Sequence, residues 1–168
     1  MANKLKEESL QDGGFRLRPV RTDDEGFLFR VYSSTREDEI SELPWDDHQR
    51  NSFMQMQFAA QRADYSRRFP DGEHMIIVLG DQRAGRLYLA RSNDEIRILD
   101  IALLPEYRNK GIGKSIIEGL TREASETNRP VRIYVELNNR ALNLFEYNGF
   151  MVVQDIGTHL LLEWRAHS

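Results

Sequence analysis

The chain has 168 residues, a formal net charge of -4 and no cysteine. This length predicts one domain, over residues 15–168, that can bury a core, and the charge balance gives no reason to expect nucleic acid as a partner. The lack of cysteine excludes disulfide frameworks, thiolate metal sites and an acyl-cysteine intermediate. No apolar run approaches the ~18 residues of a membrane span, and residues 1–14 lack the apolar region of a signal peptide. We therefore expect a cytoplasmic protein with no membrane partner and a flexible polar tail over residues 1–14.

The first part of the chain predicts one strand and two helices. An alternating run that ends at a proline favours a strand over Phe15–Val20. Apolar residues at helical spacing then predict a helix over about Thr22–Ser34. The acidic segment Arg36–Asp47 contains a proline and is expected to be a loop. A second helix should run over about Asp47–Arg67, where a Phe-Pro-Asp-Gly sequence stops it.

The middle of the chain has the composition of a small sheet. Three runs rich in β-forming residues, separated by short polar turns, predict an antiparallel meander over Met75–Gly80, Ala84–Arg91 and Glu95–Leu104. An apolar stripe at helical spacing then predicts a helix from Gly113 to about Asn128.

The end of the chain predicts three further strands and one short helix. Val131–Leu137 is typical of a strand, and a helix should follow over Asn138–Tyr147, closed by an Asn-Gly pair. The last two apolar runs are expected to form a hairpin around Gly157. The expected order of elements is therefore β-α-α-β-β-β-α-β-α-β-β, a mixture of strands and helices.

The segment Glu106–Ser115 joins the third meander strand to a helix and ends like a P-loop. The P-loop motif needs its first glycine where this chain has Arg108, and the dinucleotide-binding pattern fails at Ile116. A glycine-rich turn at a helix N-terminus nevertheless presents unpaired peptide N–H groups and partial positive charge. Arg108, Lys110 and Lys114 add positive charge to the same rim. A pyrophosphate site and a plain strand-to-helix turn both fit this segment.

Two motifs in this order of elements resemble the GNAT superfamily of N-acetyltransferases. Arg108-x-x-Gly111-x-Gly113 is similar to the acetyl-CoA motif R/Q-x-x-G-x-G/A, and Asn138–Phe150 resembles the segment N-x-x-A-x-x-x-Y-x-x-x-G-F. The resemblance covers Phe15–Trp164. It implies a single α/β (α+β) domain with a mixed central sheet of about seven strands, about four flanking helices, and a splayed V between the fourth and fifth strands.

In that superfamily acetyl-CoA enters the V as co-substrate. The resemblance implies that its pantetheine arm pairs with the strand edge at Ile101, Ala102 and Leu103, and that the amide near Ile101 polarises the acetyl carbonyl. Asn138 and Asn139 both match the motif asparagine near the pantetheine, with helix capping as the alternative role of each. The pyrophosphate would lie on the loop formed by Arg108, Asn109, Lys110, Gly111, Ile112, Gly113 and Lys114. The resemblance implies no metal.

The implied reaction is the attack of a primary amine on a thioester. An alkyl ammonium with a pKa of about 10.4 must first lose a proton to a base. Asp100 and Glu136 are the candidate bases. Asp100 could instead be a structural partner of a nearby arginine or backbone amide, and Glu136 could instead be a solvated strand end. Phe145, counted among the cofactor-binding residues, stands where the family often has a tyrosine that protonates the leaving thiolate. Tyr134 is a candidate substitute for that acid, and protonation by water is the alternative.

The expected activity is an acetyl-CoA-dependent N-acetyltransferase that works through a ternary complex. Because Phe145 replaces the tyrosine that would act as the acid, a non-catalytic acyl-CoA-binding or regulatory module is an alternative interpretation. A third interpretation is an interaction domain that binds no CoA. The carboxylates of Arg36–Asp47 favour a cationic acceptor, such as a polyamine, an aminoglycoside-like amine or a basic peptide end, with a solvated acidic loop as the alternative. The sequence leaves open which amine, small molecule or peptide, is acetylated and whether the protein is a monomer or a homodimer.

Overall fold

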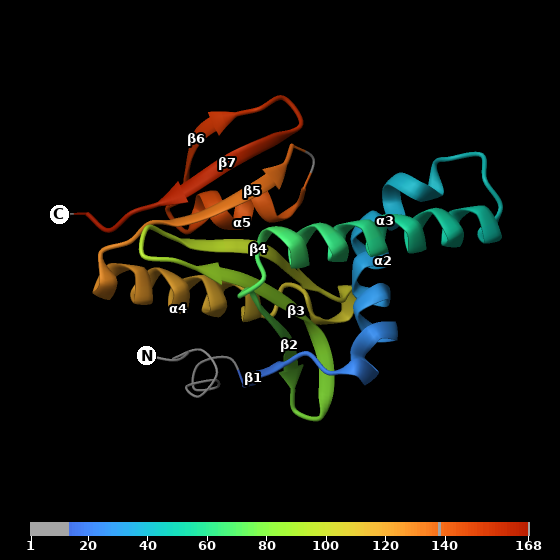
Figure 1. Ribbon diagram of the computed structural model, residues 1–168, viewed down its shortest axis with the longest axis horizontal. Helices are drawn as coiled ribbons and strands as arrows, with labels where there is room; N and C mark the ends of the chain where they lie inside the picture. The colour runs from blue at the N-terminus through green and yellow to red at the C-terminus, as the bar shows by residue number, and fades with distance from the viewer. Residues whose placement is uncertain (1–13, 138, 168) are drawn as a thin grey trace.

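The computed structural model describes residues 14–137 and 139–167, which contain a seven-stranded sheet and four α-helices (Figure 1). The strands are β1 (Phe15–Pro19), β2 (Glu73–Leu79), β3 (Gln82–Arg91), β4 (Ile96–Leu103), β5 (Val131–Glu136), β6 (Met151–Asp155) and β7 (His159–Trp164). The helices are α2 (Glu25–Ser41), α3 (Asp47–Arg68), α4 (Ile112–Thr127) and α5 (Ala141–Tyr147), with short 3-10 turns η1 (Thr22–Asp24) and η2 (Pro105–Tyr107). All but one residue of the expected polar tail lies outside the described residues.

The strands form one mixed sheet in the order β1-β2-β3-β4-β5-β7-β6. The β4–β5 pair is parallel, and the other neighbouring pairs are antiparallel. The predicted meander and the predicted C-terminal hairpin around Gly157 are both present. The expected fold class is therefore confirmed. None of the described helices is long and apolar enough to cross a membrane.

The fourth and fifth strands separate soon after they meet. Ile96–Ile98 pairs with Val131–Ile133, and the pairing stops there. Beyond that point β4 continues along β3 as far as Leu103, while β5 continues along β7 as far as Glu136. Each strand thus leaves its other edge free over its second half, and the expected V is confirmed.

A β-bulge lies at the point where the two strands part. The register between β3 and β4 slips by one residue at Leu99. Ile98 lies in the larger hydrophobic core before the bulge, and Ile101 packs against the same core after it. An unbroken strand would have turned Asp100 toward that apolar core, because alternate residues share a face. The bulge instead lets Asp100 reach the face that α2 and α3 cover.

Two hydrophobic cores lie on opposite faces of the sheet. Alternate residues of β2 divide between them, with Ile77 in the larger core and Ile76 in the smaller one. The larger core packs α4 and α5, and the smaller core packs α2 and α3. Helix α4 contributes the apolar stripe that its sequence predicted, made of Ile116, Ile117, Leu120 and Ala124, and it also buries Ile112 at its first position. Helix α4, which follows the glycine loop, therefore lies on the opposite face of the sheet from α2 and α3, which carry the acidic segment between them.

The first long helix ends later than expected. We predicted a loop from Arg36, but α2 continues to Ser41, so this prediction is wrong. The segment has no helix-breaking residue until Pro44, and its acidic composition does not prevent helix formation. The consequence is that the first carboxylates of the acidic segment lie on a helix surface rather than in a loop.

A buried carboxylate ties β1 to the start of α2. The Asp24 side chain is 1% exposed and accepts hydrogen bonds from Arg18 at 2.8 and 2.9 Å, from Arg83 at 3.1 Å and from the Arg21 N–H at 2.8 Å. The hydrogen bonds from Arg18 outweigh the effect of burial and hold the pKa of Asp24 well below its usual range.

We expect Asp24→Asn to lower the free energy of unfolding by roughly 3 kcal/mol at pH 7, because it leaves the arginines without their buried counter-charge. The pKa of Asp24 is lowered in the folded protein, so its contribution is complete above the ordinary carboxyl pKa and is lost as the pH falls. The difference between wild type and variant should therefore shrink below about pH 4 in urea unfolding curves. Asp23→Asn changes an exposed neighbour and is the control. An equal loss in both variants would contradict the prediction.

Candidate active site

The free edge of β4 faces the V. The Leu104 N–H donates to the Ala84 carbonyl of β3 at 2.9 Å. Since successive residues of an antiparallel ladder point their peptide groups in opposite directions, the groups of Ala102 face β3 and those of Ile101 and Leu103 face the V. Ile101 therefore offers a backbone donor and an acceptor to the V, and Leu103 offers its N–H, because its carbonyl accepts a hydrogen bond from Arg108.

The glycine loop follows the free edge and leads directly into α4. Gly111 has a φ of +84°, a left-handed conformation that favours glycine, and no heavy atom lies within 4 Å of the position of a Cβ there. Asn109 also has a positive φ, of 61°. The first hydrogen bond across the helix start runs from the Ser115 N–H to the Gly111 carbonyl at 3.0 Å. The preceding N–H groups of the first turn therefore lack intrahelical acceptors, which suits an anion.

Arg108 turns back toward the strand edge. Its Nε donates to the Leu103 carbonyl at 2.9 Å, and its Nη2 lies 3.5 Å from the Ser34 hydroxyl of α2. Burial and the nearby charge of Arg140 lower the pKa of Arg108. This side chain therefore braces the loop against β4 and α2.

The other residues of the loop have different surroundings. Lys110 is exposed, with its ammonium 5.9 Å from the centre of the Tyr107 ring. Lys114 is also exposed and lies 3.9 Å from a carboxylate oxygen of α4. A Cβ on Gly113 would lie 3.1 Å from Leu144, so this glycine allows α4 to pack closely against α5. The two lysines are thus the cations of the loop that face solvent.

Asp100 is bound to a buried arginine. The Arg86 side chain is 1% exposed, and its Nε donates to the Asp100 carboxylate at 2.6 Å while its Nη2 contacts the same oxygen. Nη2 of Arg86 also donates to Gln61 of α3 at 2.6 Å. Asp100 is thus the structural partner of an arginine, which was its alternative role. A role as a base stays a prediction.

Glu136 is also paired, although we had considered a solvated strand end as its alternative role. Arg36 of α2 binds both of its carboxylate oxygens at 3.0 Å, and His159 Nε2 lies 3.8 Å away. Burial alone would lower the pKa of Arg36, but the hydrogen bonds and charge of Glu136 raise it. The Glu136 side chain is 36% exposed at the mouth of the V.

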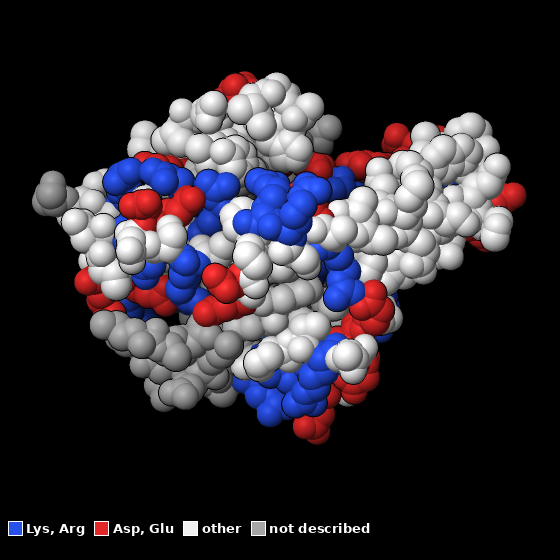
Figure 2. Space-filling model, in the orientation of Figure 1, with Lys and Arg blue, Asp and Glu red and all other residues white. Residues whose placement is uncertain are grey.

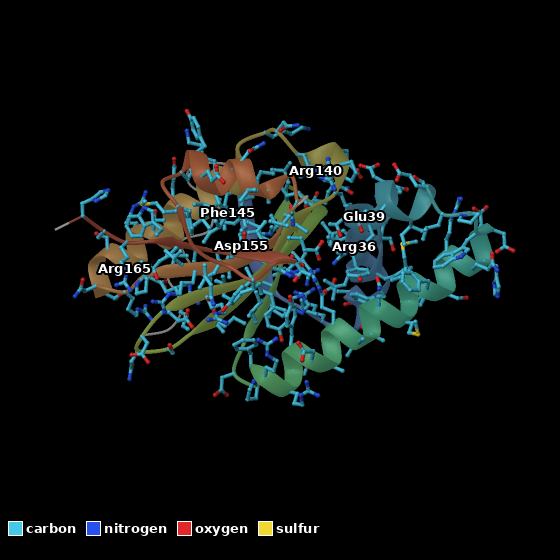
Figure 3. The ribbon with its side chains drawn as sticks, turned by 90° about the horizontal axis from the view of Figure 1, so that it is seen from above. Arg36, Glu39, Arg140, Phe145, Asp155 and Arg165 are labelled. Carbon is cyan, nitrogen blue, oxygen red and sulfur yellow. The ribbon has the colours of Figure 1, made fainter. Side chains whose placement is uncertain are left out.

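A second ion pair also joins α2 to the β5 side of the V. Arg140, just before α5, lies 3.4 Å from the Asp38 carboxylate of α2. Figure 3 shows Arg140 close to Arg36 and Glu39 on α2. Glu39 in turn lies 3.9 Å from Arg36. Two carboxylates of the acidic segment therefore face arginines of the protein itself.

Tyr134 is an exposed residue of β5. It shares a strand face with Glu136, and the Arg97 guanidinium lies 5.1 Å from its ring centre. Tyr65 of α3 lies close by and donates its hydroxyl to the Leu99 carbonyl at the bulge, at 3.1 Å. Burial, together with the charge of Asp100, raises the pKa of Tyr65 to about 12, so this hydroxyl keeps its proton at neutral pH.

The residues around α5 lie in three different situations. Phe145 has no exposed surface and packs in the larger core with its ring 5.0 Å from Phe150 (Figure 3). It therefore presents no surface to a ligand in this structure. The Asn139 side chain accepts the Ala141 N–H at 2.8 Å, as its capping role requires. Asn138 lies outside the described residues.

A pocket of about 370 Å³ opens where β4 and β5 part. It is lined by the C-terminal part of α3, by Ile98 and Leu99 of β4, by Tyr134 of β5 and by His159 of β7. In Figure 1 the C-terminal end of α3, in green, reaches the place where the two strands diverge. Within residues 14–137 and 139–167, no three histidine, aspartate or glutamate side chains gather in a way that could hold a metal ion.

The family follows from a match that covers these same elements. The model of the acetyltransferase (GNAT) family matches residues 37–150, which is more than half of the chain. The chain belongs to the GNAT acetyltransferase family. The matched part of this GNAT protein runs from α2 through β4, the glycine loop and β5 to the end of α5. Family membership supports acyl transfer as its general chemistry.

Solved structures share the fold of this GNAT protein. The PaiA N-acetyltransferase from Thermoplasma acidophilum, in complex with coenzyme A, has a TM-score of 0.67 and 19% identity over 90% of this chain and 99% of its own. PH1933 from Pyrococcus horikoshii OT3 has a TM-score of 0.65 and 18% identity over 92% and 99%. An acetyltransferase from Thermus thermophilus has a TM-score of 0.63 and 18% identity over 90% and 97%. At these identities the three establish the fold alone. No curated protein is similar enough in sequence to count as a match.

Sequence reasoning missed the partners of both candidate bases. Arg86 and Asp100 are opposite charges inside neighbouring strands, and the short turn between those strands could have indicated that they meet. Arg36 and Glu136 are 100 residues apart, and no local pattern connects them.

Proposed function

We propose that this GNAT protein transfers an acetyl group from acetyl-CoA to a primary amine by direct attack in a ternary complex. The observation that carries the proposal is the free edge of β4. After Ile98 this strand no longer pairs with β5, and it directs the peptide groups of Ile101 and Leu103 into a V that ends at an open glycine loop. The solved PaiA N-acetyltransferase, a protein of this fold in complex with coenzyme A, supports the same type of ligand here.

The chain offers suitable groups to both ends of an acyl-CoA. A free strand edge can bind an amide-containing arm in the way that it would bind an added strand. The first turn of α4 and the left-handed Gly111 leave peptide N–H groups open to a pyrophosphate. The exposed Lys110 and Lys114 add positive charge beside them. These features fit acetyl-CoA as a co-substrate.

The chemistry requires one bond to form and one to break. The nitrogen of the neutral amine bonds to the carbonyl carbon of the thioester and loses one proton, the carbon–sulfur bond breaks, and the thiolate takes up one proton. The Ile101 N–H points into the V and would donate to the carbonyl oxygen as negative charge develops on it.

We favour Glu136 over Asp100 as the base. Both carboxylates bind an arginine, but the partner of Glu136, Arg36, is 25% exposed, whereas the partner of Asp100, Arg86, is 1% exposed, so Glu136 can exchange a proton with water more readily. The amine gives up its proton to Glu136, directly or through a water molecule. Tyr134, on the same strand face, is the candidate acid for the thiolate, and water is the alternative donor.

The test combines a binding measurement with a turnover measurement. We expect calorimetry to detect CoA binding, and we expect release of free thiol from acetyl-CoA to depend on an added primary amine. CoA binding without amine-dependent thiol release over a broad amine panel would favour the non-catalytic acyl-CoA-binding or regulatory module. If neither calorimetry nor a thermal-shift measurement detects CoA binding, both of these functions are contradicted, and the interaction domain is the interpretation that remains.

A further inference from the structure

The pocket between β4 and β5 contains two arginines in addition to the residues near the candidate bases. Arg68 comes from the last turn of α3, and Arg97 comes from β4 just before the bulge. Asp64 is the one carboxylate among the described residues that line this pocket. Figure 2 shows blue basic side chains, with red acidic ones among them, across the middle of the face in view.

Both arginines are held in place by aromatic rings. The Arg97 guanidinium carbon lies 5.1 Å from the centre of the Tyr134 ring, and that of Arg68 lies 5.2 Å from the centre of the Phe69 ring. A guanidinium at this distance from a ring face is attracted to the ring and can still use its N–H groups for hydrogen bonds. Each of the two guanidinium groups therefore lies beside an aromatic ring that lines the same pocket.

The nearby carboxylates do not use all the donors of these arginines. Arg97 contacts Glu95 through Nη2 at 3.0 Å, and its Nε is buried and has no hydrogen-bond partner among the described residues. Arg68 contacts Asp64 through Nη1 at 3.0 Å. A guanidinium carries more N–H groups than one such contact occupies, so donors remain for a further anion.

The acidic group of the pocket is already neutralised. Asp64 binds Arg67 through one oxygen at 2.8 Å and Arg68 through the other. On the β7 side, His159 lies near Glu136, which is itself held by Arg36. A cationic ligand in the pocket would meet a carboxylate that two arginines share, whereas an anionic ligand would meet arginine donors.

We infer that this pocket binds a carboxylate of the acceptor, so that the acceptor is an amine that also carries a carboxylate, such as an amino acid. The pocket shares Leu99 and Tyr134 with the V. A carboxylate held there by Arg68 and Arg97 leaves the amine of the same molecule near the free edge of β4. Arginine recognises planar carboxylates with paired hydrogen bonds. The inference rests on the proposed transferase activity and specifies its substrate class.

The competing class is the cationic acceptor expected from the acidic segment. In the structure, Asp38 and Glu39 of that segment face Arg140 and Arg36. The two classes differ in one measurable property, which is the effect of a carboxylate on the acceptor.

The experiment compares acceptors that differ only in that carboxylate. We would measure kcat/KM for amino acids, for the matching carboxamides and for a diamine. Wild type should prefer the carboxylate form by about tenfold or more, because only that form pairs with the arginines. In Arg68→Gln and Arg97→Gln the KM for the carboxylate form should rise by about tenfold or more, and the KM for the carboxamide should change far less. Arg67→Gln is the matched control, because Arg67 binds the same Asp64, is 77% exposed and does not line the pocket.

A binding measurement separates this inference from the transferase proposal. N-acetyl amino acids and their amides would be titrated calorimetrically into the protein with CoA present. Binding that favours the carboxylate and is lost in the arginine variants would support the pocket even if no thiol is released, and only the transferase proposal would then fail. Equal treatment of carboxylate and carboxamide by wild type, or a preference for the diamine, would overturn the inference. Thermal unfolding checks each variant, and Arg68→Gln carries the test if Arg97→Gln does not fold.

Discussion

Replacing Gly111 with valine should weaken CoA binding by about tenfold or more, because a β-branched residue strongly disfavours the left-handed conformation and the loop must change to avoid it. Gly111 has a φ of +84° at the start of α4, so a different backbone there would move the N–H groups that face the proposed pyrophosphate. No heavy atom lies near its Cβ position, so the effect would come from the backbone and not from a clash. Calorimetric titration with CoA measures the loss.

Gly80→Val provides the matched control for this prediction. Gly80 also has a positive φ, of +61°, and also has no heavy atom within 4 Å of its Cβ position, but it lies in the turn between β2 and β3. It should lower stability by a similar amount and leave the affinity for CoA close to that of wild type. Unchanged affinity in Gly111→Val, or an equal loss in Gly80→Val, would show that the loop conformation is not what binds CoA.

Replacing Asp100 with asparagine should lower the free energy of unfolding by roughly 3–5 kcal/mol, because Arg86 would stay buried without its counter-charge. The Arg86 side chain is 1% exposed, and its remaining partner is the neutral Gln61. Urea unfolding measures the change. Asp94→Asn, at an exposed position in the turn before β4, is the control. If both variants lose the same stability, the ion pair is not a structural element.

A double variant separates the structural role of Asp100 from a catalytic one. Replacing the pair together, with Arg86→Met and Asp100→Leu, should restore most of the lost stability, because apolar side chains of similar volume avoid the cost of burying charge. If thiol release returns along with stability, Asp100 is a structural partner and not the base. If the double variant folds like wild type but releases no thiol, Asp100 takes part in the chemistry.

The order of the elements could be predicted because it depends on local patterns. The helical stripe of α4 and the alternation in the meander are visible within a dozen residues. The V itself was expected from the family resemblance, but the sequence also carries a local sign of the bulge beside it. Core-facing residues fall at Ile96 and Ile98 and then at Ile101 and Leu103, so the alternation slips by one residue at Leu99. We noted Asp100 as an unexpected carboxylate in a strand without recognising this change of phase.

The site could be predicted only where its residues lie close together in the sequence. The glycine loop was found because its spacing is contained in one short segment. Arg36, Arg68 and Arg97 reach the V from three separate elements, and only the fold brings them together. Phe145 illustrates the opposite limit, since its motif position suggested the site but its helix turns it into the core. Which side of a short helix faces inward depends on tertiary packing that a motif does not contain.

The ion pairs that join α2 to β5 and to the start of α5 make the mouth of the V sensitive to the ionic strength of the solution. Exposed pairs such as Arg140 with Asp38, which lie 3.4 Å apart, contribute about 0–1 kcal/mol each and are weakened by salt. The pair between Arg86 and Asp100 is buried deeper and is screened far less. Added salt would therefore loosen the contact of α2 with β5 and with the start of α5, while the contact between Arg86 and Asp100 stays in place. An acceptor affinity measured at low ionic strength would then refer to a V whose mouth these ion pairs hold together, and one measured at high ionic strength to the same V with a looser mouth.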